Sequence, residues 1–272
     1  MSWAYNDIDV YVTDTDNVLG ETSVDTSNWT PLSALGTLRG RPALTPSTVS
    51  ADALEIPGRD GTTYNVDARR GNAKVEFEIL IADSWTHAAL DMTVRERADC
   101  IFSLLNSMKR VAWKCPGRDA DSYFLVYKTT LTVTDGDEKA YTIKASLEVH
   151  PFEWLFEGNK PELTENHVLV VRNPLPLSRC MPVVVVNGAG AITYTPAQGT
   201  QFTCITATAS SYGDIVIDSW KEMVYTKTGT RNANRNVTGD LTNLWIYTGE
   251  TITITSSFNS EITVYTRKGI IR

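Results

Sequence analysis

The chain has 272 residues, and its 42% hydrophobic and 21% charged residues are typical of a folded globular protein. This length corresponds to one large domain or two ordinary ones. The formal net charge of −7 argues against a protein built to bind nucleic acid. No apolar run approaches the roughly 20 residues of a membrane span. We expect no secretory signal peptide, because the first residues show neither a basic start nor an apolar stretch.

Charge is distributed unevenly along the chain. Residues 1–157 hold 15 Lys and Arg against 24 Asp and Glu, which gives −9, whereas residues 158–272 hold 10 against 8, which gives +2. An acidic first part and a nearly neutral second part indicate two domains with different surroundings. The segment Glu157-Gly158-Asn159-Lys160-Pro161 resembles a linker, so we predict domains 1–157 and 158–272.

Alternating apolar residues predict antiparallel strands in the first domain. Residues 8–12 and 75–81 place apolar side chains at every second position. The clearest alternation covers residues 141–149. Residues 124–133 are expected to pair with that strand through the turn Asp135-Gly136-Asp137.

One helix is expected between these strands. Residues 84–106 show helical periodicity, with Leu90, Val94 and Ile101 on one stripe. Asp83 or Ser84 is the expected N-cap residue. A single helix among antiparallel strands predicts an α+β first domain.

The second domain is predicted to be all-β. Threonine and β-branched residues dominate it, and these residues fit a pleated, half-buried surface. Short strands separated by Gly, Asn and Ser are typical of a sandwich or barrel. The chain as a whole is therefore expected to be mainly β. The strands expected in the second domain are 182–186, 191–195, 202–208, 214–218, 244–247, 251–255 and 261–266.

The residue types that can catalyse reactions or bind metals are scattered along the sequence and form no recognisable motif. His87, His150 and His167 form no metal-binding spacing. The four cysteines form no CxxC pair, so we expect them to be reduced and packed as small hydrophobic residues. The sequence contains no nucleophile elbow, phosphate-binding loop or distinctive carboxylate pair. We therefore expect a protein that is not an enzyme and uses no metal or cofactor.

Two tryptophans of the second domain are candidates for sugar stacking. Trp220 and Trp245 lie in a predicted β-sandwich, and exposed tryptophans on such a fold can stack on a sugar ring. Core or interface packing is the simpler interpretation, because Trp245 lies within the apolar segment 244–247.

The tetrapeptide Pro-Gly-Arg-Asp occurs twice, at residues 57–60 and 116–119. Each copy predicts a tight turn, because Pro fixes one φ angle and Gly tolerates a positive φ at the next position. In order and spacing, a set of motifs across nearly the whole chain resembles the distal tail protein, the tail-tip baseplate hub of long-tailed phages with non-contractile tails. These motifs are residues 55–62, the step from Arg69-Arg70-Gly71 into a strand, the helix end Leu104-Leu105, and residues 182–188, 214–219 and 262–267.

This resemblance implies a viral structural protein. Members of the family form a hexameric ring that joins the tail tube to the tail-associated tip protein and host-recognition proteins, and DNA passes through the ring. The first domain would resemble the tail-tube fold, a β-sandwich or barrel with one helix. The second would be a galectin-like sandwich. The expected location is the tail tip of the virion, with the host cytoplasm before assembly, and no membrane partner is expected.

The resemblance also gives expectations for particular residues. Arg59 and Asp60 are expected on an exposed loop that contacts a neighbouring subunit. The acidic residues of the first domain are expected to line the channel, because carboxylates repel DNA phosphates. The alternative from another class is a carbohydrate-binding or host-adhesion module that acts through the C-terminal sandwich at Trp220 or Trp245. A glycan-degrading enzyme is a weaker alternative, because it requires two convergent carboxylates.

Overall fold

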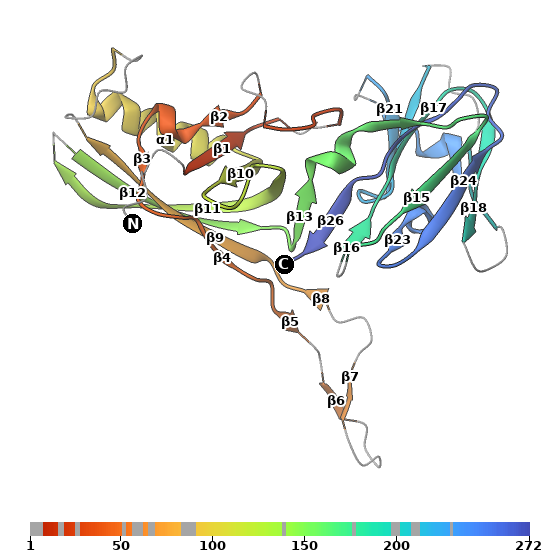
Figure 1. Ribbon diagram of the computed structural model, residues 1–272, viewed down its shortest axis with the longest axis horizontal. Coiled ribbons are helices and arrows are strands. Elements are labelled where there is room, and N and C mark those ends of the chain that lie inside the picture. The colour runs from red at the N-terminus through yellow and green to blue at the C-terminus, as the bar shows by residue number, and fades with distance from the viewer. Residues whose placement is uncertain are drawn as a thin grey trace. The chain divides into compact units, whose positions relative to one another are not determined.

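A computed structural model shows two compact units (Figure 1). The first unit comprises residues 1–16, 23–153 and 272, and the second comprises residues 17–22 and 154–271. The division expected from the sequence is a single cut after residue 157, whereas each unit here also holds a short segment from elsewhere in the chain. The residues that the structure describes are 8–15, 19–24, 28–50, 53–55, 62–64, 69–82, 91–137, 140–175, 178–196, 202–207, 213–228 and 231–272.

The first unit is built on an antiparallel sheet. The strand order is β2-β1-β10-β11-β12-β9, and β3 and β4 both pair with β9. The bounds are β1 (Asp9–Thr13), β2 (Thr30–Pro31), β3 (Thr37–Leu38), β4 (Ala43–Thr45), β9 (Ala73–Ala82), β10 (Arg110–Lys114), β11 (Ser122–Asp137) and β12 (Ala140–Val149).

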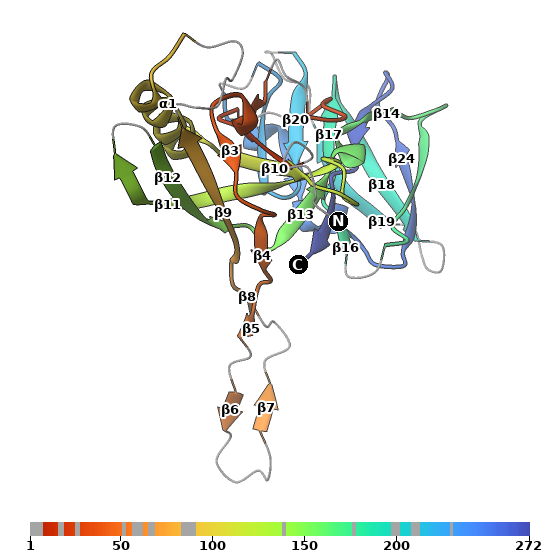
Figure 2. The same ribbon diagram turned by 60° about the vertical axis from the view of Figure 1, so that its left-hand side comes forward.

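The two-residue period of β9 and β12 produces the core of this unit. Val75 lies opposite Leu147 and Phe77 lies opposite Ala145, and all four side chains are buried on the same face. Residues of α1 (Val94–Ser107) pack against this face, as Figure 2 shows for β9, β11 and β12. The alternation predicted for residues 75–81 and 141–149 is therefore confirmed.

The helix begins later than the sequence periodicity suggested. Thr93 is the N-cap: its hydroxyl accepts the backbone N–H of Glu96, and the Glu96 carboxylate accepts the Thr93 N–H. This capping box fixes the start at Val94, so residues 91–93 are not helical and the expected range 84–106 is wrong there. The proposed caps Asp83 and Ser84 lie outside the described residues.

The hairpin between β11 and β12 also differs from the expected one. Residues Asp135–Asp137 belong to β11 and pair with Ala140–Thr142, so they do not form the turn. The register of the β11–β12 pair shifts between Val133 and Asp135, and β11 continues beyond this irregularity to Asp137.

Two short pairs of strands lie between β4 and β9 along the chain. β5 (Val49–Ser50) pairs with β8 (Arg69–Arg70), and β6 (Ala53–Glu55) pairs with β7 (Thr62–Tyr64). Gly71 donates its backbone N–H to Thr48 at 2.9 Å and so extends the β5–β8 ladder.

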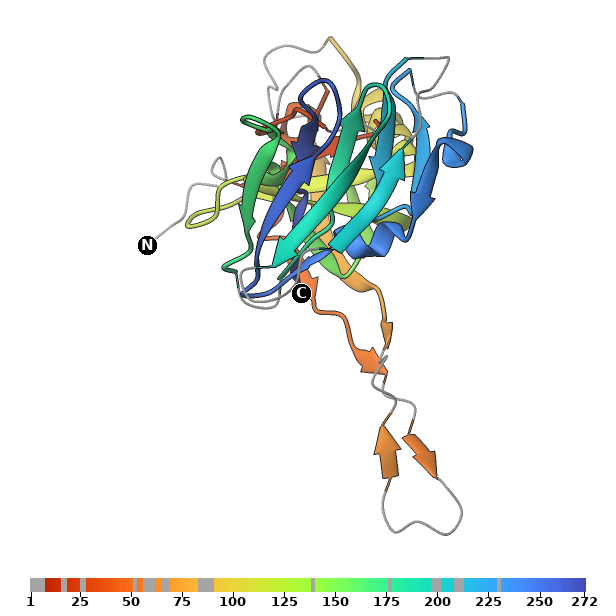
Figure 3. The ribbon, with the colours of Figure 1, turned by 90° about the vertical axis from the view of Figure 1, so that its right-hand side faces the viewer.

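The second unit consists of antiparallel sheets (Figure 3). One sheet has the order β14-β25-β17-β20-β21 and another the order β15-β24-β18-β19-β22. Between them lies a core that includes Val184, Ile217, Tyr194 and Ile254. The bounds are β14 (Pro161–Leu163), β15 (Val168–Arg172), β17 (Val183–Val186), β18 (Gly190–Pro196), β19 (Phe202–Ala207), β20 (Ile215–Asp218), β21 (Met223–Thr226), β22 (Val237–Gly239), β24 (Thr251–Ser256) and β25 (Thr263–Tyr265).

A third set of strands accompanies these sheets. β16 (Ser178–Cys180) pairs with β23 (Ile246–Tyr247) and with β26 (Lys268–Ile271), and the chain passes from the first unit to the second within β13 (Phe152–Leu155). The expected strand 244–247 is wrong in its first half, because a 3-10 helix occupies Leu241–Leu244.

The mainly-β fold is confirmed, with one α-helix among the described residues. The sheets of the described residues do not close into a barrel.

Candidate functional site

Of the two Pro-Gly-Arg-Asp segments, only the second lies within the residues that the structure describes. Arg59 and Asp60 lie outside them, in the connection between β6 and β7, where Glu55 pairs with Thr62. The role expected for Arg59 and Asp60 therefore stays a prediction. The second segment is described fully.

The second Pro-Gly-Arg-Asp segment forms the tight turn between β10 and β11. The backbone groups of Cys115 and Arg118 exchange hydrogen bonds of 2.8 and 2.9 Å. Gly117 between them has a φ of +83°, which glycine adopts without the strain that other residues suffer. The turn points the Arg118 guanidinium over the Trp113 ring, 4.3 Å from its centroid.

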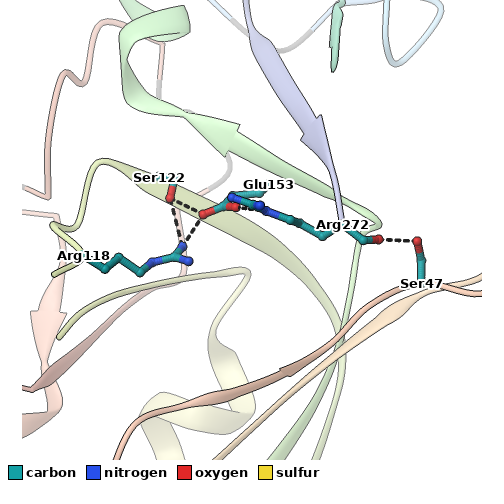
Figure 4. Close-up of polar contacts among 5 residues, drawn as sticks. All are labelled: Ser47, Arg118, Ser122, Glu153 and Arg272. Carbon is teal, nitrogen blue, oxygen red and sulfur yellow. Dashed lines mark hydrogen bonds and ion pairs between the residues drawn. The ribbon is translucent and has the colours of Figure 1, made fainter. Parts of the chain in front are cut away.

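Arg118 belongs to a polar cluster around Glu153, the Glu153 cluster (Figure 4). Its guanidinium donates to the Glu153 carboxylate and, at 3.1 Å, to the Ser122 hydroxyl. The Ser122 hydroxyl in turn donates to Glu153 at 2.5 Å. The side chain of Arg272 donates to the other carboxylate oxygen of Glu153.

The Glu153 cluster continues through the backbone of Arg272. Its carbonyl oxygen accepts the Ser47 N–H at 3.0 Å and also the Ser47 hydroxyl, and its N–H donates to Pro151 at 2.9 Å. Three segments that are distant in sequence, those of Arg118 and Ser122, Glu153 and Arg272, therefore meet at one buried carboxylate, and Ser47 joins them through the Arg272 carbonyl. Since the Glu153 side chain is only 3% exposed and faces two guanidinium groups, it is a buried ion-pair partner that is inaccessible to a substrate.

Trp220 is a partly buried ring in the second unit. It contacts Trp154 edge to face with centroids 5.4 Å apart, and the Arg267 guanidinium lies 5.8 Å from its centroid. Arg267 also pairs with the fully buried Asp218 at 2.8 Å. These contacts favour the packing interpretation of Trp220.

Trp245 is also partly buried, and its indole N–H donates to the Ser219 carbonyl at 3.1 Å. The Arg179 guanidinium covers the ring at 4.9 Å from the centroid and lies equally far from the Tyr247 ring. Sugar stacking by Trp220 or Trp245 stays a prediction.

Charged side chains of β9, β11 and β12 form ion pairs on the solvent face of the sheet. Three ion pairs lie there: Lys74–Glu76 at 2.8 Å, Lys144–Glu78 at 2.9 Å and Lys128–Glu148 at 3.4 Å. The acidic excess of residues 1–157 is therefore not concentrated in these ion pairs. The expected acidic channel wall gains no support from this face.

One pocket formed by the described residues has few ionisable side chains in its lining. A pocket of about 290 Å³ lies where β1, the start of β2 and the end of α1 meet, and Asp14 is the one ionisable residue among its described lining. No group of three or more His, Cys, Asp and Glu side chains that could hold a metal ion occurs in the described part of the chain. Within that part, no helix is long and apolar enough to cross a membrane.

Two buried groups have shifted pKa values that suit a structural role. Burial raises the pKa of the Cys180 thiol to about 12, so this cysteine is an unreactive thiol at neutral pH. Burial lowers the pKa of His150 to about 4, and its imidazole accepts the Phe152 N–H at 3.3 Å while stacking on the Phe152 ring. His150 is therefore neutral at pH 7.

Sequence reasoning did not identify the Glu153 cluster or the Arg179 contacts. One signal was present for the first: a glutamate inside the aromatic segment 152–156, which indicates a buried and paired carboxylate. Nothing in the sequence around Arg179 indicates its aromatic neighbours, because β16 and β23 are distant in the chain.

Comparison with solved structures shows the fold. The chain is similar to the Dit protein of phage SPP1, described as a paradigm of the hub adsorption apparatus in phages that infect Gram-positive bacteria. The TM-score is 0.57 with 13% identity, over 88% of this chain and 96% of that one.

The chain is also similar to a chain of the phage P2 baseplate in its activated conformation, solved with Ca and with Sr. The TM-scores are both 0.51, with 9% and 10% identity, over 96% of this chain and 97% of the other. No protein-family model matches the sequence, and no curated protein matches it.

Proposed function

We propose that this protein is a structural hub of a phage tail tip. The observation that carries the proposal is the fold likeness over nearly the whole chain to the SPP1 hub protein and the P2 baseplate chain. The motif order in the sequence supports the same assignment independently of the coordinates. As a hub, the protein acts by joining other proteins and performs no chemistry.

The hub is proposed to be a ring of six copies that connects the tail tube to the tail-associated tip protein and lets DNA pass. A ring requires two different contact surfaces on each copy, because each subunit binds one neighbour with one surface and the next neighbour with the other. The proposed subunit contact at Arg59 and Asp60 would lie on one of them.

The ion pairs on the main sheet suit a channel through which DNA slides. Lys74, Lys128 and Lys144 are each paired with a glutamate. Lysines that are already paired would bind DNA phosphates weakly and release few counterions from them. The wall would therefore neither hold the DNA nor repel it strongly.

Electron microscopy of the purified chain tests this proposal. We expect closed rings with a central hole at high protein concentration, and no shift of double-stranded DNA in a gel at low salt. Particles without rings, or tight binding to DNA, would contradict the hub assignment. Tail tips decorated by an antibody against the chain would support it further.

A further inference from the structure

One long hairpin of the first unit runs from β4 to β9. Its register is the same on both sides of residues 46–48: Thr45 pairs with Lys74 before them, and Val49 pairs with Arg70 after them. The pairs β4–β9 and β5–β8 therefore belong to one hairpin. β6 and β7 pair further along the same hairpin, next to the first Pro-Gly-Arg-Asp segment.

The strand pairing of this hairpin is interrupted at residues 46–48, which we term the hairpin hinge. These residues belong to no strand, and Pro46 has no N–H to donate to the opposite strand. Across the hairpin at this point, the Gly71 N–H donates to the Thr48 carbonyl at 2.9 Å. Because local stability falls where backbone pairing is sparse, the hairpin bends most easily here.

Arg272 contacts the hairpin hinge through its backbone. Its carbonyl oxygen accepts the Ser47 N–H at 3.0 Å and also the Ser47 hydroxyl (Figure 4). Its N–H donates to the Pro151 carbonyl at 2.9 Å. The Arg272 backbone therefore connects the hinge to the residues just before β13.

The Arg272 side chain is held separately from its backbone. Its guanidinium donates to the Glu153 carboxylate, which is 3% exposed and also accepts from Arg118 and Ser122. A hydrogen bond between two charged groups is stronger than one between neutral groups. The Glu153 cluster therefore fixes the position at which the Arg272 carbonyl meets Ser47.

We infer that Arg272 is a clasp that locks the hairpin hinge. When the clasp opens, residues 49–70 change direction with respect to β9. The clasp is a property of a single chain. In a further consequence, which rests on the proposed function, it sets where the first Pro-Gly-Arg-Asp segment meets a neighbouring copy in the hub.

Hydrogen exchange of the protein at a concentration too low for assembly tests the clasp. We expect Arg272→Ala to speed exchange at Ser47 and Gly71 about tenfold more than exchange in β9 and β12. Arg272→Lys should have a smaller effect, because lysine keeps the charge but not the planar fork. Lys268→Met is the matched control: it also removes the cationic partner of a glutamate, at 3.1 Å from Glu157, and should leave exchange at the hinge as in the wild type.

A double variant tests whether the side chain and the backbone of Arg272 act as one device. Once its guanidinium no longer holds Glu153, the Arg272 carbonyl is not kept against Ser47. Ser47→Ala combined with Arg272→Ala should therefore exchange like Arg272→Ala alone.

Three results would overturn the inference: additive effects of the two substitutions, unchanged exchange at Ser47 and Gly71 in Arg272→Ala, or an equal rise throughout β9 and β12, which would show a general loss of stability. A wild type that forms no rings, together with an Arg272→Ala variant whose hinge opens, would contradict the hub function and leave the clasp intact.

Discussion

At the scale of single residues, the Glu153 cluster is the most demanding electrostatic feature of the first unit. Its carboxylate is almost fully buried, and Arg118 and Arg272 neutralise it. Removal of one member of a buried pair costs more than the pair contributes, because the remaining charge loses its partner.

We expect Glu153→Gln to lower the free energy of unfolding by about 3 kcal/mol. Urea denaturation measures this change. Glu148→Gln is the control, because Glu148 and Lys128 form an exposed pair whose loss costs about 1 kcal/mol or less. Equal effects of the two substitutions would show that the cluster does not stabilise the fold.

His150 makes stability depend on pH. Its pKa of about 4 in the folded protein lies below the ordinary value of 6.5, so the unfolded chain binds the proton more readily between these values. Stability attributable to His150 is therefore complete above pH 6.5 and is lost as the pH falls toward 4.

The expected loss is up to about 3 kcal/mol, since each unit of pKa difference corresponds to about 1.4 kcal/mol. In His150→Asn the amide oxygen can replace the ring nitrogen as acceptor from Phe152, and this variant should show a flatter stability profile over that range. Parallel profiles of the wild type and His150→Asn would contradict this account.

At the scale of elements, the capping box sets where α1 begins. Thr93→Ala removes the hydroxyl that accepts the Glu96 N–H, and we expect a loss of about 1 kcal/mol in chemical denaturation. Ser103→Ala lies on the exposed side of the same helix and should be neutral or slightly stabilising, because alanine favours helix.

Close backbone packing at Gly158 holds the 3-10 helix Phe156–Asn159 against the start of β26. A Cβ atom on Gly158 would lie 2.4 Å from the backbone nitrogen of Lys268, so Gly158→Ala must displace backbone. We expect a loss of about 1–3 kcal/mol. Gly71→Ala, whose added Cβ has its nearest contact at 3.6 Å, should cost less than half as much. A thermal shift that is equal for both variants would contradict this interpretation.

The local sequence pattern predicted the strands in which apolar and polar residues alternate. It did not predict contacts between residues that are distant in the chain. The strands at 75–81 and 141–149 could be predicted because their apolar side chains alternate and pack on one face into the core. The helical periodicity through Val94 and Ile101 also predicted α1 correctly. Because Leu90 fits the same periodicity, the predicted helix began before the capping box at Thr93. The pair of Glu153 and Arg272 spans 119 residues, and no local pattern encodes such a contact.

At the scale of the whole molecule, the account rests on assembly. Fold likeness to the SPP1 hub protein and to a chain of the P2 baseplate, together with the motif order, supports the proposal that the protein binds copies of itself and other tail proteins.

Native mass spectrometry at rising protein concentration tests this central claim most directly. The account predicts a species of six chains, each of 30.1 kDa, that grows at the expense of the monomer without a stable series of larger polymers. A closed ring explains that end point, because its contact surfaces are all used. A chain that remains monomeric, or that stops at a stable dimer at the highest concentration, would contradict the account.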